Sequence, residues 1–377
     1  LQATDNLGER AVGGRARLLG PGRLEVNGRE IATRSIVLAT GSSPAVPPAW
    51  QALGERLLTT DTLFERETLP PRIAVVGLGA IGVEMAQALA RLGIEVAAFG
   101  RGHLGGLTDA KVSAAATALL GGEFALHLGA EADVIEKDGA LRVRAGTTEV
   151  TVDAVLAALG RRPNLAGLGL EALGIALDAR GLPPVDPNTQ QVANLPLFLA
   201  GDANGQVPLL HEAADEGHIA GLNAVRVATG EKPVCFARRT PLAIVFSEPN
   251  IAVAGRRRAD LADGTFIEGE IDFARQGRAR AGQRNHGLMR LYAEPETGRL
   301  LGAEMCAPAA EHMAHLLALA LDRGMTVREL LRLPFYHPVL EEGLRSALRE
   351  LAAQLPAAGE SDLNACTFEA IGAEALD

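Results

Sequence analysis

Residues 73–99 constrain the fold more than any other stretch of this sequence. An apolar run of strand length, residues 73–76, leads into Gly77-Leu78-Gly79-Ala80-Ile81-Gly82 and then into a helical pattern, and a second apolar run ends at Phe99. In such a loop the first glycine permits a tight turn, the second lets a pyrophosphate approach, and the third lets the helix pack closely. The helix N-terminus offers N–H groups to the phosphates. The stretch therefore predicts a strand–helix–strand unit that binds a dinucleotide, with a ligand-free glycine turn as the alternative.

The overall composition indicates a soluble globular protein of two or three domains. The 377 residues are 47% hydrophobic and 22% charged, with a formal net charge of −10. This acidic balance argues against a nucleic-acid or anionic membrane partner. No run approaches the roughly 20 apolar residues of a membrane span, and residues 1–10 do not resemble a signal peptide.

Cysteine usage favours a reducing compartment, and we expect a cytoplasmic location. The three cysteines lie far apart in the sequence, so they predict neither a metal site nor a redox pair. They are Cys235, Cys306 and Cys366.

Several local signals predict elements around the glycine loop. We expect hairpins at Asn27-Gly28 and Asp138-Gly139, and a strand over residues 35–39 that is buried on both faces. Asp109 is predicted to cap a helix that stops at Gly121. Short apolar strands are expected at 154–159 and 197–200, and helices at 60–67 and 209–224.

From residue 241 the pattern becomes that of an antiparallel sheet. Four strands are expected at 243–247, 251–254, 288–292 and 300–305, followed by helices at 311–323 and 340–355. Residues 356–377 are small, polar and weakly periodic, which predicts a flexible tail.

Three of the apolar strands end in residues suited to ligand binding. They end in Thr40-Gly41, Gly160-Arg161 and Gly201-Asp202. The carboxyl ends of parallel strands are where such sheets bind ligands. Asp202 can accept a hydrogen bond from a sugar hydroxyl, or alternatively cap the following turn.

A histidine near the C-terminus is a candidate base. His337 precedes Pro338, a residue suited to the first position of a helix, and Glu342 is predicted to reach back to the imidazole. A carboxylate on one ring nitrogen fixes the tautomer and leaves the other nitrogen as a base near neutral pH. The alternative is a surface histidine with a solvated glutamate. For His312 and His315 a structural role is expected, and no metal site is predicted.

Taken in order, these motifs resemble those of the flavin-dependent pyridine nucleotide–disulfide oxidoreductases, most of all the dihydrolipoamide dehydrogenase branch. The resemblance covers about residues 25–355 and includes segments 209–217 and 247–252. It implies an α/β fold with two Rossmann-like nucleotide-binding domains, the first incomplete, and a C-terminal α+β dimerisation domain. The implied parts are a partial FAD-binding domain (1–68), an NAD(P)-binding domain (69–165), the continued FAD-binding or central domain (166–238), the dimerisation domain (239–355) and the flexible tail (356–377).

The resemblance also implies roles for individual residues. FAD would be held by Thr40, Gly41, Gly201, Asp202, Leu210, His211 and Ala213. The pyrophosphate of NAD or NADP would be bound by Gly77, Gly79, Ala80, Ile81 and Gly82. Glu84 would lie near the nicotinamide and flavin rings, and Gly160 and Arg161 would line the nicotinamide side. His337, oriented by Glu342, would act on the dithiol chemistry of the partner subunit in a homodimer.

Three departures from the family pattern matter. The family's own first strand, glycine loop and redox cysteine pair are not found, so the chain resembles a member lacking roughly the first hundred residues. We expect this stretch alone not to pass hydride through flavin to a disulfide. Gly100-Arg101 stands where NAD-preferring folds place an acid, which favours a 2′-phosphate and hence NADP. The absence of an adjacent cysteine pair near the C-terminus weakens the likeness to mercuric reductase and to the large thioredoxin reductases.

The sequence thus predicts an oxidoreductase that passes hydride between NAD(P)H and an enzyme disulfide or dithiol substrate, such as a small-molecule or lipoyl-type disulfide. Two alternatives remain open. One is a flavin enzyme of the same fold without a disulfide step, such as a transhydrogenase or quinone reductase. The other is a non-catalytic fragment that binds nucleotide and dimerises.

Overall fold

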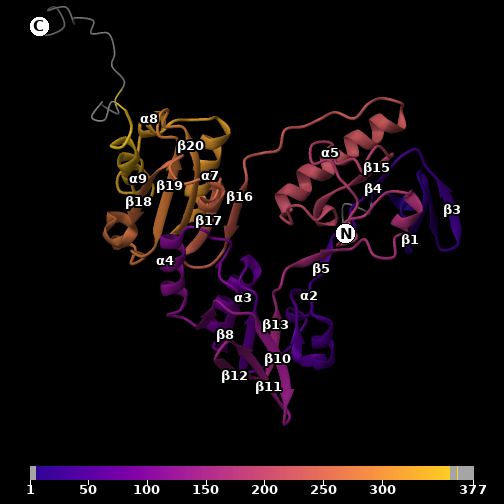
Figure 1. Ribbon diagram of the computed structural model, residues 1–377, viewed down its shortest axis with the longest axis horizontal. Coiled ribbons are helices and arrows are strands. Elements are labelled where there is room, and N and C mark those ends of the chain that lie inside the picture. Colours follow the sequence, from indigo (N-terminus) through magenta and orange to yellow (C-terminus); the bar gives the residue numbers. More distant parts are fainter. Residues whose placement is uncertain (1–5, 357–362, 364–377) are drawn as a thin grey trace, which may run out of the picture. The chain divides into compact units, whose positions relative to one another are not determined.

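The structure is a computed structural model that describes residues 6–356 and residue 363 (Figure 1). Its contacts divide the chain into two compact units: residues 1–45 with 160–238, and residues 46–159 with 239–377. Residues 46–68, expected with the first domain, are grouped with the second unit. Cys366 and, apart from residues 356 and 363, the expected tail lie outside the described residues.

The first unit contains a two-stranded parallel sheet against which a long helix packs. Strand β4 (Ile36–Leu38) pairs with β15 (Leu197–Leu199), and α5 (Leu210–Ala228) contacts both. All three residues of β15 are buried, but Val37 in the middle of β4 is 39% exposed. The expectation that this strand is buried on both faces was wrong. Among the described residues β4 pairs with β15 alone, and an edge strand is covered less completely than a central one.

Short antiparallel elements complete the first unit. Strands β1 (Ala16–Gly20), β2 (Arg23–Val26) and β3 (Arg29–Ala32) form a meander. The predicted Asn27-Gly28 hairpin is confirmed, and both turn residues have the positive φ of a type I′ turn. The remaining elements are β5 (Ser42–Pro44), which pairs with β14 (Arg161–Pro163), and the 3-10 helices η1 (Gly8–Arg10), η3 (Leu170–Leu173) and η4 (Gly201–Asn204).

The second unit is built first on a five-stranded parallel sheet with strand order β6-β13-β7-β8-β9. Its central strand β7 is fully buried from residue 73 to 76, because α3 and a small antiparallel sheet pack against it. The predicted strand–helix–strand unit is confirmed. The bounds are β6 (Leu57–Leu58), β7 (Arg72–Val76), β8 (Glu95–Gly100), β9 (Ala125–Leu128), β13 (Ala154–Ala157), α2 (Thr60–Leu63), α3 (Ala80–Arg91), α4 (Ala110–Leu120) and η2 (Pro48–Arg56).

The small antiparallel sheet confirms the second predicted hairpin. Strands β10 (Ala132–Lys137) and β11 (Ala140–Ala145) meet at Asp138-Gly139, and β12 (Thr148–Val152) completes the sheet. The predicted helix cap is also confirmed, because the Asp109 carboxylate accepts hydrogen bonds from the backbone N–H groups of Lys111 and Val112.

A second five-stranded sheet, antiparallel in the order β16-β17-β20-β19-β18, forms the C-terminal part. The four predicted strands are present. The fifth strand, β18, was missed although its sequence IEGEID alternates apolar and acidic residues, because the glycine at its centre weakens the strand pattern. A Cβ on Gly269 would lie 2.3 Å from the Ala347 carbonyl oxygen of α9, so close packing requires that glycine. The bounds are β16 (Leu242–Val245), β17 (Asn250–Gly255), β18 (Ile267–Asp272), β19 (Leu288–Ala293), β20 (Leu300–Ala307), α6 (Gly277–Ala281), α7 (Ala310–Asp322), α8 (Val327–Leu331), α9 (Glu342–Ala352), η5 (Arg258–Asp260) and η6 (Phe273–Arg275).

A buried carboxylate joins α4 to this second sheet. Glu304 of β20 is fully buried and accepts hydrogen bonds from the backbone N–H groups of Thr108 (2.6 Å), Asp109 (2.9 Å) and Arg258 (2.8 Å). Next to it, Tyr292 donates to Asp109 Oδ2 at 3.0 Å. Burial raises the pKa of Tyr292 well above its ordinary value, so the hydroxyl stays protonated and keeps donating.

We expect Glu304→Gln to lower the free energy of unfolding by about 1–3 kcal/mol. The amide replaces an acceptor oxygen by an NH₂ group that faces backbone donors, so buried N–H groups lose their partner. Urea denaturation measures the change. Glu296→Gln, at an exposed position of the same domain, is the matched control. A loss no larger than that of the control would contradict the structural role of Glu304.

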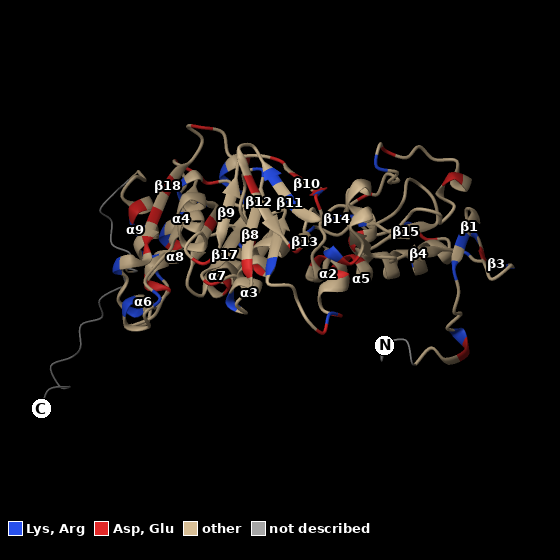
Figure 2. Ribbon diagram, turned by 90° about the horizontal axis from the view of Figure 1, so that it is seen from below, with Lys and Arg blue, Asp and Glu red and all other residues tan. Residues whose placement is uncertain are grey.

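Charge is distributed without a dominant sign in the view of Figure 2, where basic and acidic segments alternate along the ribbon. Within the described part of the chain no helix is long and apolar enough to cross a bilayer.

Candidate functional site

The glycine loop leaves one open position in front of a helix. A Cβ on Gly77 would lie 2.2 Å from the Ala158 carbonyl oxygen, and a Cβ on Gly82 would lie 1.7 Å from the Gly77 carbonyl oxygen. A Cβ on Gly79 would meet no atom within 4 Å. The first and third glycines are therefore required for packing, whereas the second leaves space at the start of α3. This arrangement fits a pyrophosphate approaching the backbone.

The first turn of α3 faces this space with unpaired donors. Gly79 is the N-cap residue and provides no side-chain cap. Ala80 and Ile81 follow it as the first helical residues, so helix geometry leaves their N–H groups without intrahelical acceptors. Glu84, expected near the cofactor rings, accepts a hydrogen bond from the Phe246 backbone N–H at 2.8 Å. That contact ties α3 to the segment between β16 and β17.

The next strand end places an arginine at the same edge of the sheet. Gly100 is buried at the end of β8, where a Cβ would lie 3.0 Å from Leu78 Cδ1. Arg101 follows and is exposed. Its Nη2 lies 2.5 Å from Glu131 Oε1, a residue from the segment after β9. The guanidinium predicted to recognise a 2′-phosphate therefore has a carboxylate partner.

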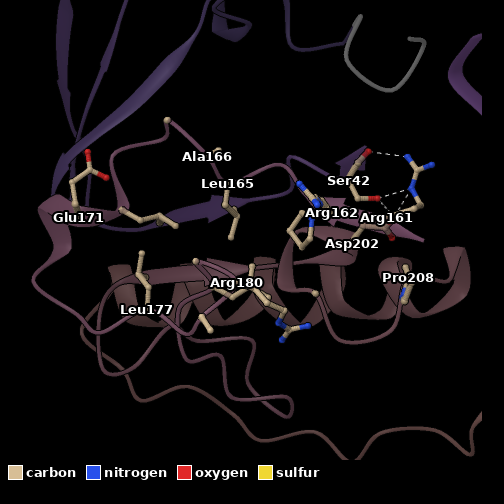
Figure 3. A pocket seen from close by; sticks show the side chains of 17 residues that line it. Ser42, Arg161, Arg162, Leu165, Ala166, Glu171, Leu177, Arg180, Asp202 and Pro208 are labelled. Atoms are coloured by element: carbon tan, nitrogen blue, oxygen red, sulfur yellow. Dashed lines mark hydrogen bonds and ion pairs between the residues drawn. The ribbon is translucent and has the colours of Figure 1, made fainter. Parts of the chain in front are cut away.

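In the first unit the structure brings the three predicted strand ends together through Ser42 (Figure 3). Ser42 Oγ donates to Asp202 Oδ2 at 2.6 Å, and Arg161 Nε donates to Ser42 Oγ at 2.6 Å. The Arg161 Nη2 also donates to the Ser42 carbonyl oxygen at 2.8 Å. Arg161, expected on the nicotinamide side, also lies 3.6 Å from the carboxylate of Asp202, one of the residues expected to hold FAD.

Hydrogen bonds from Asn164 hold the strand end at Thr40-Gly41. Asn164 Nδ2 donates to the Thr40 carbonyl oxygen at 3.0 Å, and the Asn164 backbone N–H donates to the Gly41 carbonyl oxygen at 2.9 Å. Gly160 in turn accepts from the Ala45 backbone N–H at 2.8 Å. The segments that begin at Thr40 and at Gly160 are therefore joined at several points.

A buried ion-pair network positions Gly201 and Asp202. Glu216 of α5 is fully buried, accepts from the Gly201 backbone N–H at 2.8 Å, and lies 3.0 Å from Arg238 Nη2. Arg238 also pairs with Glu212, one turn earlier on α5. The sequence did not predict Ser42, Glu216 and Arg238 as functional residues. The spacing of Glu212 and Glu216 was visible, but nothing local pairs them with Arg238.

The predicted residues at the start of α5 have different surroundings. Leu210 is 88% exposed, and His211 is exposed beside it. Ala213 packs against the Gly201 turn, since a Cβ on Gly201 would lie 3.1 Å from the Ala213 Cβ. Ala213 is thus the member of this group that contacts the other predicted flavin residues.

A cavity of about 750 Å³ lies beside Ser42 and Asp202. Its lining combines three arginines with an apolar set, as Figure 3 shows for several of them. The arginines are Arg161, Arg162 and Arg180, and the apolar residues include Leu165, Leu170, Leu177 and Leu182. Such a lining can take a ligand that is anionic in one part and apolar in another.

The predicted histidine–glutamate contact is present. His337 Nδ1 lies 2.9 Å from Glu342 Oε1, and Glu342 Oε2 accepts from the Val339 backbone N–H at 3.2 Å. The hydrogen bond from His337 lowers the pKa of Glu342 below its ordinary value. The imidazole is 79% exposed, so Nε2 can meet a reacting group.

The expectation that Pro338 opens a helix was wrong. Helix α9 begins at Glu342, four residues later, with Glu341 as its N-cap. The Val339 N–H donates to the Glu342 side chain. If the helix began at Pro338, this N–H would lie in the first turn and would have no acceptor within the helix. The histidine therefore lies on a loop, and the first residue of the helix orients it.

Neither cysteine within the described residues belongs to a thiol pair. Cys306 is fully buried, and burial raises its pKa to about 12, so it stays an unreactive thiol. Cys235 is exposed and free. Among the described residues no group of three or more histidines, cysteines or carboxylates is arranged to hold a metal ion.

Comparison with known proteins identifies the family. The family profile "Pyridine nucleotide-disulphide oxidoreductase" matches residues 5–217, and the profile of its dimerisation domain matches residues 242–348. The chain belongs to the pyridine nucleotide-disulphide oxidoreductases. These enzymes are oxidoreductases that use FAD and a nicotinamide dinucleotide, and the α/β fold expected from the sequence is confirmed.

Two curated proteins illustrate the similarity of this chain to other members of the family. Mercuric reductase of Acidithiobacillus ferrooxidans is 33% identical over 88% of this chain, and mitochondrial dihydrolipoyl dehydrogenase of Canis lupus familiaris is 31% identical over 84%. The chain spans 59% and 64% of the lengths of these two proteins. Mercuric reductase is thus among the relatives even though this sequence has no adjacent cysteine pair near its C-terminus.

Solved structures give the same fold. LpdA of Mycobacterium tuberculosis is 28% identical, with a TM-score of 0.75 over 90% of this chain and 77% of that one. The HOCl-induced flavoprotein disulfide reductase RclA of Escherichia coli is 23% identical, with a TM-score of 0.78 over 92% of this chain and 81% of that one. The second likeness shows the fold alone.

Proposed function

We propose that this chain functions in an FAD-dependent oxidoreductase that passes hydride between NADH or NADPH and a disulfide or dithiol substrate, as dihydrolipoyl dehydrogenase does by its name. The open space at Gly79, in front of the first turn of α3, is the observation that supports it most directly. In the reductive direction one hydride and one proton convert a disulfide into two thiols.

The residues of both units suit the two cofactors. The first turn of α3 supplies N–H donors and a positive helix end to a dinucleotide pyrophosphate. Asp202, with one oxygen engaged by Ser42, keeps acceptor capacity for a sugar hydroxyl, and Arg161 is a donor beside it. Bound FAD would supply a two-electron relay between the nicotinamide and the thiols.

His337 would handle the proton of the thiol chemistry. Glu342 holds Nδ1 at 2.9 Å and so leaves Nε2 to take a proton from a thiol or return it. Both residues lie within the span that matches the dimerisation domain. We therefore expect a homodimer in which His337 of one subunit serves the thiols at the other.

The acidic net charge and the scattered cysteines support a cytoplasmic protein without a nucleic-acid or membrane partner. The substrate would be a small-molecule or lipoyl-type disulfide.

The second candidate function is that of a flavin enzyme of the same fold. Within the described residues Cys235 is exposed, Cys306 is buried, and the two form no disulfide. A flavin enzyme without a disulfide step, such as a transhydrogenase or quinone reductase, needs no thiol pair.

Absorbance of the purified protein distinguishes these functions. A flavin spectrum that NADH or NADPH bleaches and that lipoamide restores supports the first proposal. Bleaching by nicotinamide with no response to a disulfide, but with turnover of a quinone, supports the second. Nucleotide binding without flavin would contradict both and leave a nucleotide-binding, dimerising role.

We expect Arg101→Ala to weaken NADPH binding about tenfold and NADH binding much less. An arginine at this strand end gives a 2′-phosphate a charge-assisted hydrogen bond that the 2′-hydroxyl of NADH does not need. Isothermal titration of both nucleotides measures the difference. An equal loss for both, or none, would remove Arg101 from cofactor selection.

A further inference from the structure

The carboxyl edge of the parallel sheet holds a carboxylate that the sequence analysis did not consider. Three adjacent strands end there: β7 leads into Gly77, β8 into Arg101, and β9 into the segment that contains Glu131. Ligands of such sheets bind outside this edge. The Glu131 carboxylate and the Arg101 guanidinium form an ion pair of 2.5 Å with side chains 73% and 75% exposed.

Contacts of the two preceding residues, Gly129 and Ala130, place Glu131 at this edge. The Gly129 N–H donates to the Gly100 carbonyl oxygen at 3.0 Å and so ties the end of β9 to the end of β8. Ala130 then packs against the hydrophobic cluster that includes Phe99. Because Gly129 and Ala130 are anchored, the side chain of Glu131 reaches the side chain of Arg101, which follows Gly100.

Dinucleotide folds use this position to select the cofactor. An acid at the end of the second strand accepts from the ribose 2′-hydroxyl of NAD, whereas an arginine accommodates the 2′-phosphate of NADP. Here the second strand supplies Arg101, and the neighbouring strand supplies Glu131 to the same place. This edge therefore carries both an acid and an arginine, and the two form an ion pair with each other.

We propose that Glu131 is a selectivity residue that competes with the 2′-phosphate of NADPH for Arg101 and accepts from the 2′-hydroxyl of NADH. The proposal rests on the nicotinamide binding proposed above. An exposed ion pair is weak, so a phosphate with more charge and three acceptor oxygens can displace the carboxylate. The displaced Glu131 still lies near that phosphate and repels it. NADPH therefore binds less tightly than it would at a site with Arg101 but without the Glu131 carboxylate. NADH still binds, because Glu131 accepts from its 2′-hydroxyl.

Glu131→Gln tests this competition in the whole chain. We expect its affinity for NADPH to rise roughly three- to tenfold and its affinity for NADH to change less than about twofold, because the amide keeps an acceptor oxygen but loses the charge. Isothermal titration with each nucleotide gives the ratio. Thermal melting checks the fold, which an exposed residue should leave unchanged.

Glu149→Gln is the matched control. It removes one charge from the same unit, at a carboxylate that pairs with Arg142 and Arg144 on the antiparallel sheet. We expect it to leave the ratio of NADPH to NADH affinity unchanged. In an Arg101→Ala background the gain from Glu131→Gln should shrink, since the guanidinium for which the two anions compete is gone.

The outcomes separate this proposal from the proposed function. If the unaltered chain binds neither nucleotide, the function fails and the selectivity role fails with it. If both nucleotides bind, but Glu131→Gln leaves their affinity ratio unchanged or Glu149→Gln shifts it equally, only the role of Glu131 is overturned.

Discussion

Replacing His337 by glutamine in the full-length, flavin-loaded protein should slow dithiol turnover by about two to four orders of magnitude. The imidazole is exposed and Glu342 fixes it through Nδ1, so Nε2 is the atom available to exchange a proton with a thiol. Glutamine can hydrogen-bond at this position but cannot take up a proton near neutral pH. Reduction of flavin by NADH or NADPH should be unaffected, because that step does not involve the thiol proton.

Steady-state turnover with lipoamide, and rapid-mixing measurement of flavin reduction, separate the two steps. Glu342→Gln should give a smaller loss and a shifted pH profile, since the amide can still contact the ring but carries no charge. His312→Gln, at an exposed histidine on α7, is the matched control and should leave turnover unchanged. Full activity of His337→Gln would show that the histidine is structural.

Gly79→Ala should lower the affinity for NADH and NADPH by about a hundredfold with little effect on folding. The new methyl group would enter the open space in front of α3, where the pyrophosphate is expected, and would disturb about one charge-assisted hydrogen bond of roughly 1.5–3 kcal/mol, whose upper end corresponds to about a hundredfold. The backbone of Gly79 has φ −70°, which any residue can adopt.

Gly82→Ala should instead destabilise the protein by about 3 kcal/mol or more, because its Cβ would lie 1.7 Å from the Gly77 carbonyl oxygen. Urea denaturation and nucleotide titration distinguish the two variants. Gly277→Ala, where a Cβ meets no atom within 4 Å, is the control for both measurements. If Gly79→Ala bound nucleotide normally, the proposed location of the pyrophosphate would be wrong.

Local features of this protein could be read from its sequence. The glycine loop, the two hairpins at Asn27 and Asp138 and the cap at Asp109 are confirmed. In the hairpins and the cap the determining contacts join residues close in the chain: a two-residue turn with positive φ, or a side chain that reaches N–H groups two and three residues on. The His337–Glu342 contact spans five residues and belongs to the same class.

Errors arose where packing overrode a local pattern. Strand β18 was missed because Gly269 interrupts its alternating pattern, although α9 packs directly on that glycine. Val37 looked buried because its neighbours are apolar, yet burial depends on which strands and helices lie beside it. The helix predicted over 340–355 begins at Glu342, and Pro338, expected at its first position, lies in the preceding loop, where the Glu342 side chain accepts from the Val339 N–H.

By itself the sequence determined that this chain has a dinucleotide loop, the family's ordered motifs and a histidine with a nearby carboxylate. Only the tertiary structure decided which distant groups meet: Ser42 with Asp202, Glu216 with Arg238, and Glu131 with Arg101. Such pairs lie 22 to 160 residues apart in the chain, and they form where separate strands end at a shared edge or where the segment after α5 returns to that helix. Spacing in the sequence carries no signal of that shared edge, so the glycine loop predicts a nicotinamide dinucleotide, whereas the Arg101–Glu131 pair proposed to select between NADH and NADPH is visible only in the tertiary structure.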